Sequence, residues 1–356
     1  MAAIVAIAAL LLSGCSDDAS TQASPSASAT STSPTGLLPA AQGATQYPLT
    51  LKTAWGQTTL EKRPERIAVV NSYGTDVELL ASIGVTPVLA PDTFERSVWT
   101  LDALPKKVET VYPFDESKPY PYEAVAAAKP DLIIVTAEDI GAQAYQRLST
   151  IAPVLAAPTS KDTVASWQDR LTQIGQALDL SDAAKGVIAN YDKYFADVRA
   201  KNPKFAGLTA TYLVVFTSEW GGIEYYSGAG STVESLFQTL GFKRNPLADK
   251  FGDKRTTVSP ELLSSVDADV LIVANNTQDV KRTEFNRLLT EQPLYKQLSA
   301  VQKGHAVVFD NTGRGGFAFN GKQEKGNIAW ALGYPGPLST EWAAGHIVSM
   351  INSVLN

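Results

Sequence analysis

Residues 122–135 read YEAVAAAKPDLIIV, and residues 260–273 repeat the pattern as PELLSSVDADVLIV. In each stretch a glutamate opens a segment of helical spacing, and four apolar residues follow an aspartate. A short apolar run between turn signals is typical of a buried strand. A helix that leads into such a strand belongs to a βαβ unit, the building block of a parallel sheet. The two stretches therefore predict two α/β halves of the same construction.

Strands and helices alternate on both sides of these stretches. We predict strands over 67–70, 88–90, 132–135 and 153–155 in the first half, and over 212–216, 271–273 and 306–309 in the second. A helix begins at Thr75, and Ser231 with Glu234 forms a capping box that opens another. Pro260 opens a further helix. The alternation predicts two Rossmann-like lobes with mostly parallel sheets.

A long amphipathic segment lies between the halves. Within 181–201, apolar side chains recur at three- and four-residue spacing, at Ala184, Val187, Ile188, Tyr191 and Phe195. This is one face of a helix roughly 28 Å long at 1.5 Å per residue. We predict that it joins a first lobe over 47–180 to a second over 202–356. The alternative is an ordinary packing helix inside one domain.

The beginning of the chain has the pattern of an export signal. Residues 2–12 are apolar but too few to span a bilayer stably. The run ends in Leu-Ser-Gly-Cys, which resembles the lipobox of bacterial lipoproteins, and Cys15 is the one cysteine in the chain. We predict a signal peptide over 1–14 and a diacylglycerol on Cys15. No Lys or Arg precedes the run, which indicates a truncated start; the alternative is an apolar segment that ends in Cys by chance.

Residues 15–46 are rich in Ser, Thr, Ala and Pro. Such a composition buries too little apolar surface to offset its ordering entropy. It predicts a disordered tether that holds the lobes near the extracytoplasmic face of a bacterial cell membrane.

Composition excludes several classes of protein. The chain has 356 residues, a net charge of −6, one Cys and two His. Two histidines and one cysteine rule out structural zinc clusters and a disulfide framework. The acidic balance argues against nucleic acid as a partner. No apolar run is long enough for a polytopic membrane protein.

The paired stretches, lipobox and tether together resemble the ABC-transporter substrate-binding proteins for iron–siderophore and cobalamin uptake. Trp167 and the segment 329–333 support this resemblance, which runs from about residue 67 to the C-terminus. It implies the class III periplasmic-binding-protein fold, in which one long backbone helix joins two lobes. It also implies a monomer that binds its ligand between the lobes and delivers it to a membrane permease and, through it, an ATPase. It implies no enzyme.

The resemblance gives a role to one glutamate in each lobe. Glu123 and Glu261 match the exposed residues through which the family engages its permease. A carboxylate in the first turn of a helix is favoured by the helix dipole. Pro121 stands where the first lobe would normally supply a capping side chain, and the alternative is that both are ordinary first-turn glutamates.

A ferric siderophore arrives with its iron already coordinated, so the protein needs no metal ligand or cofactor. It needs aromatic faces and, for an anionic chelate, guanidinium groups. Loops predicted to follow the strands supply both, and paired arginines favour an anionic chelate. The predicted ligand-binding residues are Tyr73, Phe94, Arg96, Trp99, Tyr112, Trp220, Tyr225, Arg255, Arg314 and Phe317. Each has an alternative as a packing aromatic or a surface cation.

Other ligands and another class of protein stay open. Tandem Tyr225 and Tyr226 would suit bare ferric iron, and a flat haem or corrinoid would also use aromatic walls. An extracytoplasmic hydrolase would need a nucleophile, but no Gly-x-Ser-x-Gly elbow is present. Neither His305 nor His346 has a partner placed for general base catalysis.

Overall fold

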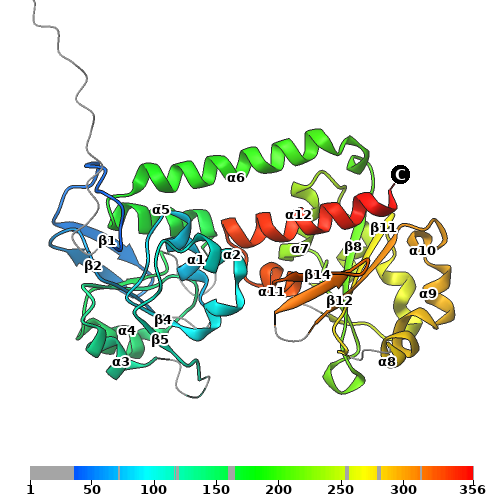
Figure 1. Ribbon diagram of the computed structural model, residues 1–356, viewed down its shortest axis with the longest axis horizontal. Helices are drawn as coiled ribbons and strands as arrows, with labels where there is room; N and C mark the ends of the chain where they lie inside the picture. The colour runs from blue at the N-terminus through cyan, green and yellow to red at the C-terminus, as the bar shows by residue number, and fades with distance from the viewer. Residues whose placement is uncertain are drawn as a thin grey trace, which may run out of the picture. The chain divides into compact units, whose positions relative to one another are not determined.

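The computed structural model describes residues 36–70, 73–115, 117, 120–158, 165–252, 256–278, 282–312 and 315–355. The predicted signal peptide and Cys15 lie outside these residues. Residues 32–356 form one compact unit, and within it two sheets organise two lobes (Figure 1).

The first lobe is built on a five-stranded parallel sheet with strand order β5-β4-β3-β6-β7. Its strands are β3 (Ile67–Val69), β4 (Leu89–Pro91), β5 (Thr110–Tyr112), β6 (Leu132–Val135) and β7 (Val154–Ala156). Its helices are α1 (Thr75–Ser82), α2 (Val98–Ala103), α3 (Tyr122–Ala128), α4 (Gly141–Ser149) and α5 (Trp167–Ala177), with a 3₁₀ turn η1 (Asp92–Arg96). A hairpin of β1 (Leu49–Thr53) and β2 (Gly56–Leu60) precedes them.

The second lobe has a seven-stranded sheet of order β10-β9-β8-β11-β12-β13-β14. Its strands are β8 (Ala210–Val215), β9 (Ile223–Tyr225), β10 (Thr256–Thr257), β11 (Val270–Asn275), β12 (Ala306–Asn311), β13 (Gly316–Phe319) and β14 (Lys322–Lys325). The central strands β8, β11 and β12 are parallel, as predicted, whereas the outer strands pair antiparallel. The antiparallel edges are a difference from the first lobe that the apolar pattern did not show.

Short helices cover the second sheet. They are α7 (Thr232–Thr239), α8 (Thr283–Phe285), α9 (Pro293–Gln297), α10 (Ser299–Gln302), α11 (Ile328–Gly333) and the longer α12 (Pro337–Val354). Tighter or wider turns are η2 (Pro203–Phe205), η3 (Ser218–Trp220), η4 (Pro246–Lys250), η5 (Pro260–Val266) and the π-helical η6 (Asn286–Thr290). The Ser231 half of the predicted capping box is confirmed, since the Ser231 hydroxyl accepts the Glu234 amide. The Glu234 carboxylate accepts the amide of Gly230 and not that of Ser231. The helix predicted at Pro260 is instead the 3₁₀ helix η5.

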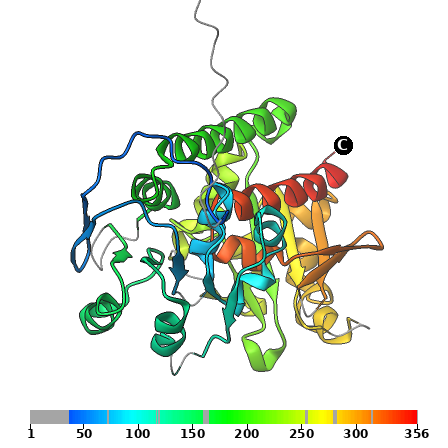
Figure 2. The same ribbon diagram turned by 60° about the vertical axis from the view of Figure 1, so that its left-hand side comes forward.

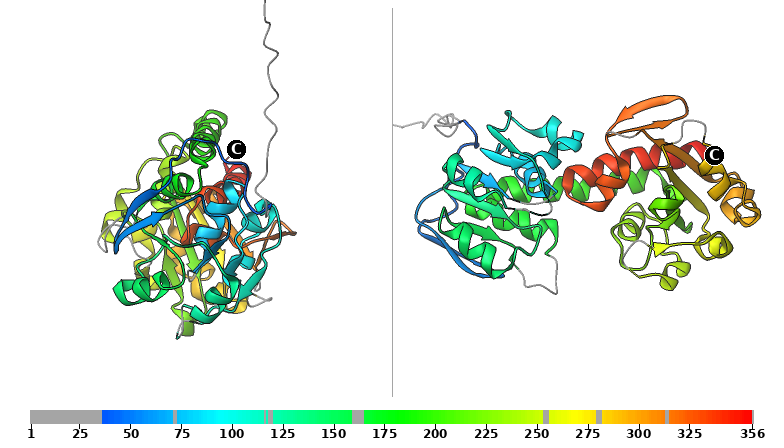
Figure 3. Two further views of the ribbon diagram at one scale, coloured as in Figure 1. Left: turned by 90° about the vertical axis from the view of Figure 1, so that its left-hand side faces the viewer. Right: turned by 90° about the horizontal axis from the view of Figure 1, so that it is seen from below.

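The predicted long helix is confirmed as α6 (Ser181–Lys201). The apolar face of α6 packs into the hydrophobic cores of both lobes, one at each end of the helix. Ala184 is buried in the core of the first lobe, and Phe195 is buried in that of the second. Tyr191, midway between them, packs against both. Helix α12 lies alongside α6 and runs in the same direction (Figures 1 and 2; Figure 3, right).

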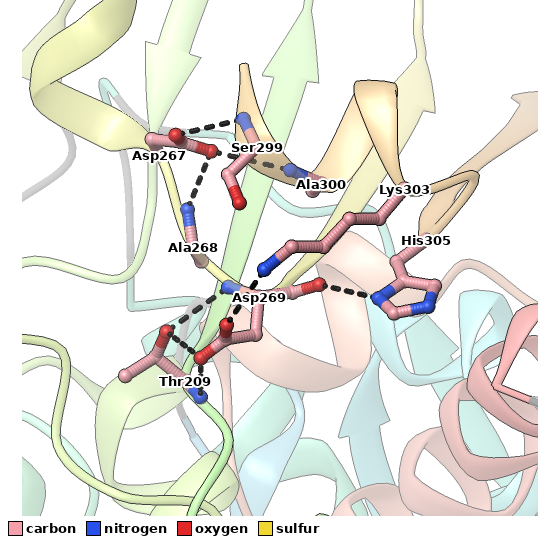
Figure 4. A network of polar contacts seen from close by, with 8 residues as sticks. All are labelled: Thr209, Asp267, Ala268, Asp269, Ser299, Ala300, Lys303 and His305. Atoms are coloured by element: carbon pink, nitrogen blue, oxygen red, sulfur yellow. Dashed lines mark hydrogen bonds and ion pairs between the residues drawn. The ribbon is translucent and has the colours of Figure 1, made fainter.

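The aspartates of the repeated pattern anchor strand ends. The Asp131 carboxylate accepts the backbone amides of Glu65 and Arg66, just before β3. In the second lobe, Asp269 accepts the amide and the hydroxyl of Thr209, just before β8 (Figure 4). Each aspartate thus ties the start of its own strand to that of the neighbouring strand. The aspartates of the repeated sequence pattern therefore have a structural role, since they hold the starts of neighbouring strands together.

Burial opposes ionisation of Asp269, but its surroundings overcome this effect. The hydrogen bonds from Thr209 and the nearby Lys303 ammonium hold the pKa of the carboxyl below its usual value. Its backbone carbonyl lies 3.2 Å from Nδ1 of His305 (Figure 4). His305 therefore belongs to this structural network.

The predicted tether is too long at its C-terminal end. Leu37 and Leu38 are buried in the core of the first lobe. The amides of Gly43, Ala44 and Thr45 donate to the carboxylate of Asp179. Residues 36–46 are therefore packed against the first lobe. Burial of the two leucines and the hydrogen bonds to the Asp179 carboxylate stabilise this packing, although most residues around them are small and polar.

A buried carboxylate joins the first lobe to the start of α12. Glu78 of α1 accepts the amides of Leu338 and Ser339 at 3.0 and 2.9 Å, together with the Ser339 hydroxyl at 2.9 Å. The indole of Trp99 donates to its other oxygen at 3.0 Å. A side chain at Gly336 would overlap this carboxylate. Glu78 therefore caps a helix whose far end belongs to the second lobe.

Burial raises the pKa of Glu78 to about 7, although the hydrogen bonds from Ser339, Trp99 and Leu338 act to lower it. Because this pKa is higher in the folded than in the unfolded chain, protonation of Glu78 stabilises the fold. That stabilisation is complete below the ordinary pKa of 4.5 and is lost as pH rises through about 7. The shift corresponds to about 3 kcal/mol.

We expect the free energy of unfolding of the wild-type chain to fall relative to that of Glu78→Gln as pH rises from about 4 to about 8. Urea titrations at several pH values measure this difference. Glu61→Gln, on an exposed side chain, is the matched control and should follow the wild type. A difference between wild type and Glu78→Gln that stays constant with pH would contradict this role.

Candidate ligand-binding cleft between the lobes

A cavity of about 790 Å³ lies between the two lobes. The first lobe lines it with Tyr73, Trp167 and Arg170, and the second with Thr232, Leu236 and Tyr334. Tyr191 of α6 and Thr340 of α12 complete the wall on the side of the two long helices. A volume of this size suits a small-molecule ligand.

Three helices begin at this cavity. Thr75, Trp167 and Thr232 are the first residues of α1, α5 and α7, and all three line it. This follows from the topology of the first lobe, because α1 follows the carboxyl end of β3 and α5 follows that of β7. The N-terminus of a helix carries positive partial charge and unpaired amides. The helix dipoles therefore contribute positive potential to the cavity, opposite in sign to the Glu138 carboxylate that also lines it.

Aromatic rings from both lobes meet around Tyr73 and Tyr334, which both line the cavity. Tyr73 stacks on Tyr334 with ring centroids 4.3 Å apart and lies 6.0 Å from Trp330. Phe114 lies 6.1 Å from Tyr73, and Trp330 lies 4.7 Å from Tyr334. We call these four residues the aromatic wall. The guanidinium carbon of Arg96 lies 5.3 Å from the Trp330 ring centroid, a distance typical of a cation–π contact.

Two of the predicted ligand residues are brought together here. Tyr73 belongs to the wall, and the exposed Arg96 stands beside it. Trp220 is separate: it lies in η3 with 72% of its surface exposed and does not line the cavity. Arg255 and Arg314 lie outside the described residues, so their predicted roles stay predictions.

Five predicted ligand residues are buried in the structure. Phe94 and Tyr112 belong to the core of the first lobe, and Tyr225 and Phe317 to those of the second. Trp99 is buried against Trp342, 4.9 Å away, and donates to Glu78. The structure corrects these five from cleft contacts to packing residues. Each of the five belongs to a strand, turn or helix whose apolar side faces inward. A position near a predicted loop does not show in the sequence that the side chain faces the core.

The structure adds residues in the cleft, Tyr334 and Arg170, and one beside it, Trp330, that sequence reasoning missed. Trp330 was noted only as part of the family resemblance, and Tyr334 was not singled out. Their spacing of four residues places them on one side of α11 and its end. Arg170 stands in α5 among the buried Trp167, Leu171 and Ile174. A charged residue at an inward-facing helical position was the available signal.

The two predicted docking glutamates are exposed. Glu123 is in the first turn of α3, with 89% of its side chain exposed and Arg147 at 3.8 Å. Glu261 is in the first turn of η5. Hydrogen bonds from its own backbone amide and from the Ser259 hydroxyl hold the pKa of Glu261 below its usual value. Both carboxylates are therefore available to a partner.

The described residues lack two kinds of feature. No described helix has the length and apolar character needed to cross a bilayer. Within the same part of the chain, no group of three or more His, Cys, Asp and Glu is arranged to hold a metal ion.

Comparison with known proteins agrees with this architecture. A family model described as periplasmic binding protein matches residues 68–312. The chain belongs to the periplasmic binding protein family. It is a substrate-binding component of ABC transport and not an enzyme, as the sequence predicted.

Curated relatives come from the iron–siderophore branch of the family. A probable siderophore-binding lipoprotein of Bacillus subtilis, YfiY, is 32% identical over 276 residues, which are 74% of this chain and 80% of that protein. The Fe(3+)-citrate-binding protein YfmC of Bacillus subtilis is 27% identical over 259 residues, 72% of this chain and 76% of that one. The predicted resemblance to iron–siderophore binding proteins is confirmed.

Solved structures confirm the predicted fold class. A periplasmic solute binding protein from Mycobacterium smegmatis matches with a TM-score of 0.66 at 25% identity, covering 86% of this chain and 99% of that one. Staphylococcus aureus SirA, solved with staphyloferrin B, matches with a TM-score of 0.61 at 22% identity, covering 85% and 98%. At that identity, SirA supports the fold alone.

Proposed function

We propose that this chain captures a ferric siderophore outside the cytoplasmic membrane and delivers it to an ABC importer. The observation that carries the proposal is the aromatic wall, in which Tyr73 of one lobe stacks on Tyr334 of the other beside Arg96. Rings and a guanidinium recognise the organic shell of a chelate and need no direct bond to iron. The names of the curated relatives support the same class of ligand.

The charges around the cleft favour an anionic chelate. Arg96 and Arg170 supply two guanidinium groups, and three helix N-termini line the cavity.

Capture of bare ferric iron by tandem tyrosines has less support. Tyr225 has no exposed surface and packs on Phe251 with ring centroids 4.5 Å apart. Burial raises the pKa of Tyr225 to about 12, which disfavours the phenolate that would bind iron. Haem and corrinoids remain alternatives, since the aromatic wall offers faces to any flat ligand.

Membrane attachment is the second part of the proposal. Cys15 would carry a lipid, and the residues that follow it would tether the lobes at the membrane surface. The relatives YfiY and YhfQ of Bacillus subtilis are both described as lipoproteins, which supports the lipobox.

Docking to the permease is the third part. Glu123 and Glu261 present one exposed carboxylate from each lobe, in the first turns of α3 and η5. Exposed charge pairs set orientation and association rate more than raw affinity. This suits a carrier that must dock and then leave.

The proposal predicts saturable quenching of intrinsic fluorescence by ferric siderophores. Trp330→Phe should remove part of the quenching, the rest coming from Trp167 in the cavity lining, and should weaken binding roughly threefold through lost ring contacts. Trp55→Phe, in the turn between β1 and β2, is the matched control and should keep both. Iron-free chelators, ferric chloride, haemin and cobalamin complete the panel. Tight binding of haemin or cobalamin, with no response to any ferric siderophore, would overturn the iron assignment.

The docking assignment predicts a separation of binding from delivery. In the double variant Glu123→Ala with Glu261→Ala, the affinity for the ferric chelate should stay unchanged while uptake into cells collapses. Glu61→Ala with Glu291→Ala, one exposed glutamate per lobe, is the matched control and should transport normally. A parallel loss of affinity in the Glu123 and Glu261 variant would refute the docking role.

A further inference from the structure

Arg170 is a buried cation in which two side-chain nitrogens have no hydrogen-bond partner. Only 8% of its side chain is exposed, and its Nε and Nη1 atoms are buried without a hydrogen-bond partner. Among the described residues its ion-pair partner is Asp76, whose Oδ1 lies 3.7 Å from Nη1. That separation is too long for a hydrogen bond. Leaving such donors unsatisfied costs more than a typical hydrogen bond contributes.

Asp76 balances the charge of Arg170 but does not satisfy its donors. The two Asp76 oxygens already accept the amide and the hydroxyl of Thr136, at 2.7 and 2.5 Å. Asp76 is itself fully buried. This carboxylate is therefore held by the first lobe and keeps the guanidinium in place without using its N–H groups.

The guanidinium lies at the wall of the cavity between the lobes. Arg170 is in the first turn of α5, and Ser166 and Trp167 at the start of that helix line the same cavity. Thr232 and Ser235 of α7 line it from the second lobe and bring hydroxyl groups. Among the described residues that line the cavity, Glu138 brings a carboxylate, which accepts a hydrogen bond from the Tyr120 hydroxyl at 3.4 Å. The guanidinium of Arg170 thus brings hydrogen-bond donors to the cavity wall, where a ligand group that accepts hydrogen bonds is the missing partner.

We propose that Arg170 binds a carboxylate of the ligand, and hence that the chelate is of the carboxylate type. This inference rests on the proposed function and narrows it. A carboxylate can accept two parallel hydrogen bonds from one edge of a guanidinium, which gives affinity and orientation together. A neutral ferric trihydroxamate has no anionic group to offer. Arg170 therefore selects between siderophore classes, while the aromatic wall accepts either.

The test compares two ferric chelates on three variants. Ferric citrate should bind Arg170→Gln at least about tenfold more weakly than wild type, since hydrogen bonds to a charged group are lost. Arg170→Lys should stay weak, because an ammonium lacks the planar edge. Any binding of ferrichrome, a neutral trihydroxamate, should change by less than about twofold. Arg287→Gln, on an exposed side chain, is the control and should bind as wild type.

A measurement on the wild-type chain covers the case in which the Arg170 variants do not fold. The Nε–Hε resonance of each arginine side chain is observable by NMR. Side chains of Glu, Lys and Gln have no such group, so the signal is specific to arginine. Metal-free tricarballylate, a plain tricarboxylate, should shift one strongly protected resonance and leave exposed arginines unmoved. Absence of any shift at saturating tricarballylate and ferric citrate would overturn the inference.

Failure of the inference and failure of the proposed function give different results. Tight binding of ferrichrome, with affinities for ferric citrate equal in wild type and Arg170→Gln, would overturn the role of Arg170 and leave siderophore capture standing. Binding of neither ferric chelate, with a shifted arginine resonance in tricarballylate, would support the carboxylate site and overturn siderophore capture.

Discussion

The carboxylate of Glu78 lies at the point where the first lobe meets α12, and the geometry of the cleft depends on it. Two backbone amides, a hydroxyl and an indole converge on one buried side chain. Since α12 is packed into the core of the second lobe, this contact joins the lobes a second time, beside the covalent connection through α6. Two connections, α6 and α12, restrain the tilting of one lobe relative to the other more than a single connection would. Bending either helix would break its backbone hydrogen bonds.

The same two helices form part of the cavity. Tyr191 of α6 and Thr340 of α12 both line it, and the aromatic wall closes another side with rings from each lobe. The ligand site is therefore made of groups whose relative positions the two connections fix. A site held in this way loses little entropy when it binds, which favours affinity. In our proposal, charge then selects the ligand, through Arg96 and the buried Arg170.

The sequence predicted the framework well because that framework rests on local pattern. Apolar runs after Asp131 and Asp269 give the central strands, and the three- and four-residue spacing over 181–201 gives α6. The cleft was predicted poorly. Its decisive contact joins Tyr73 to Tyr334, which lie far apart in the chain, and spacing carries no information on such a pair. Tyr225 and Phe317 were predicted to contact the ligand, but both are buried in the cores of the second lobe. An aromatic residue near a loop can still face the core, and the sequence does not show which way it faces.

The central claim is that the two lobes stand at a fixed spacing around a preformed site. Spin labels test it directly, one in each lobe at the exposed Gln146 and Gln297, each replaced by cysteine in a Cys15→Ser background. The distance distribution between the labels is compared without ligand and with saturating ferric chelate. We expect one narrow distribution whose mean moves by no more than about 2 Å. A broad distribution without ligand that collapses to a much shorter distance on binding would contradict it.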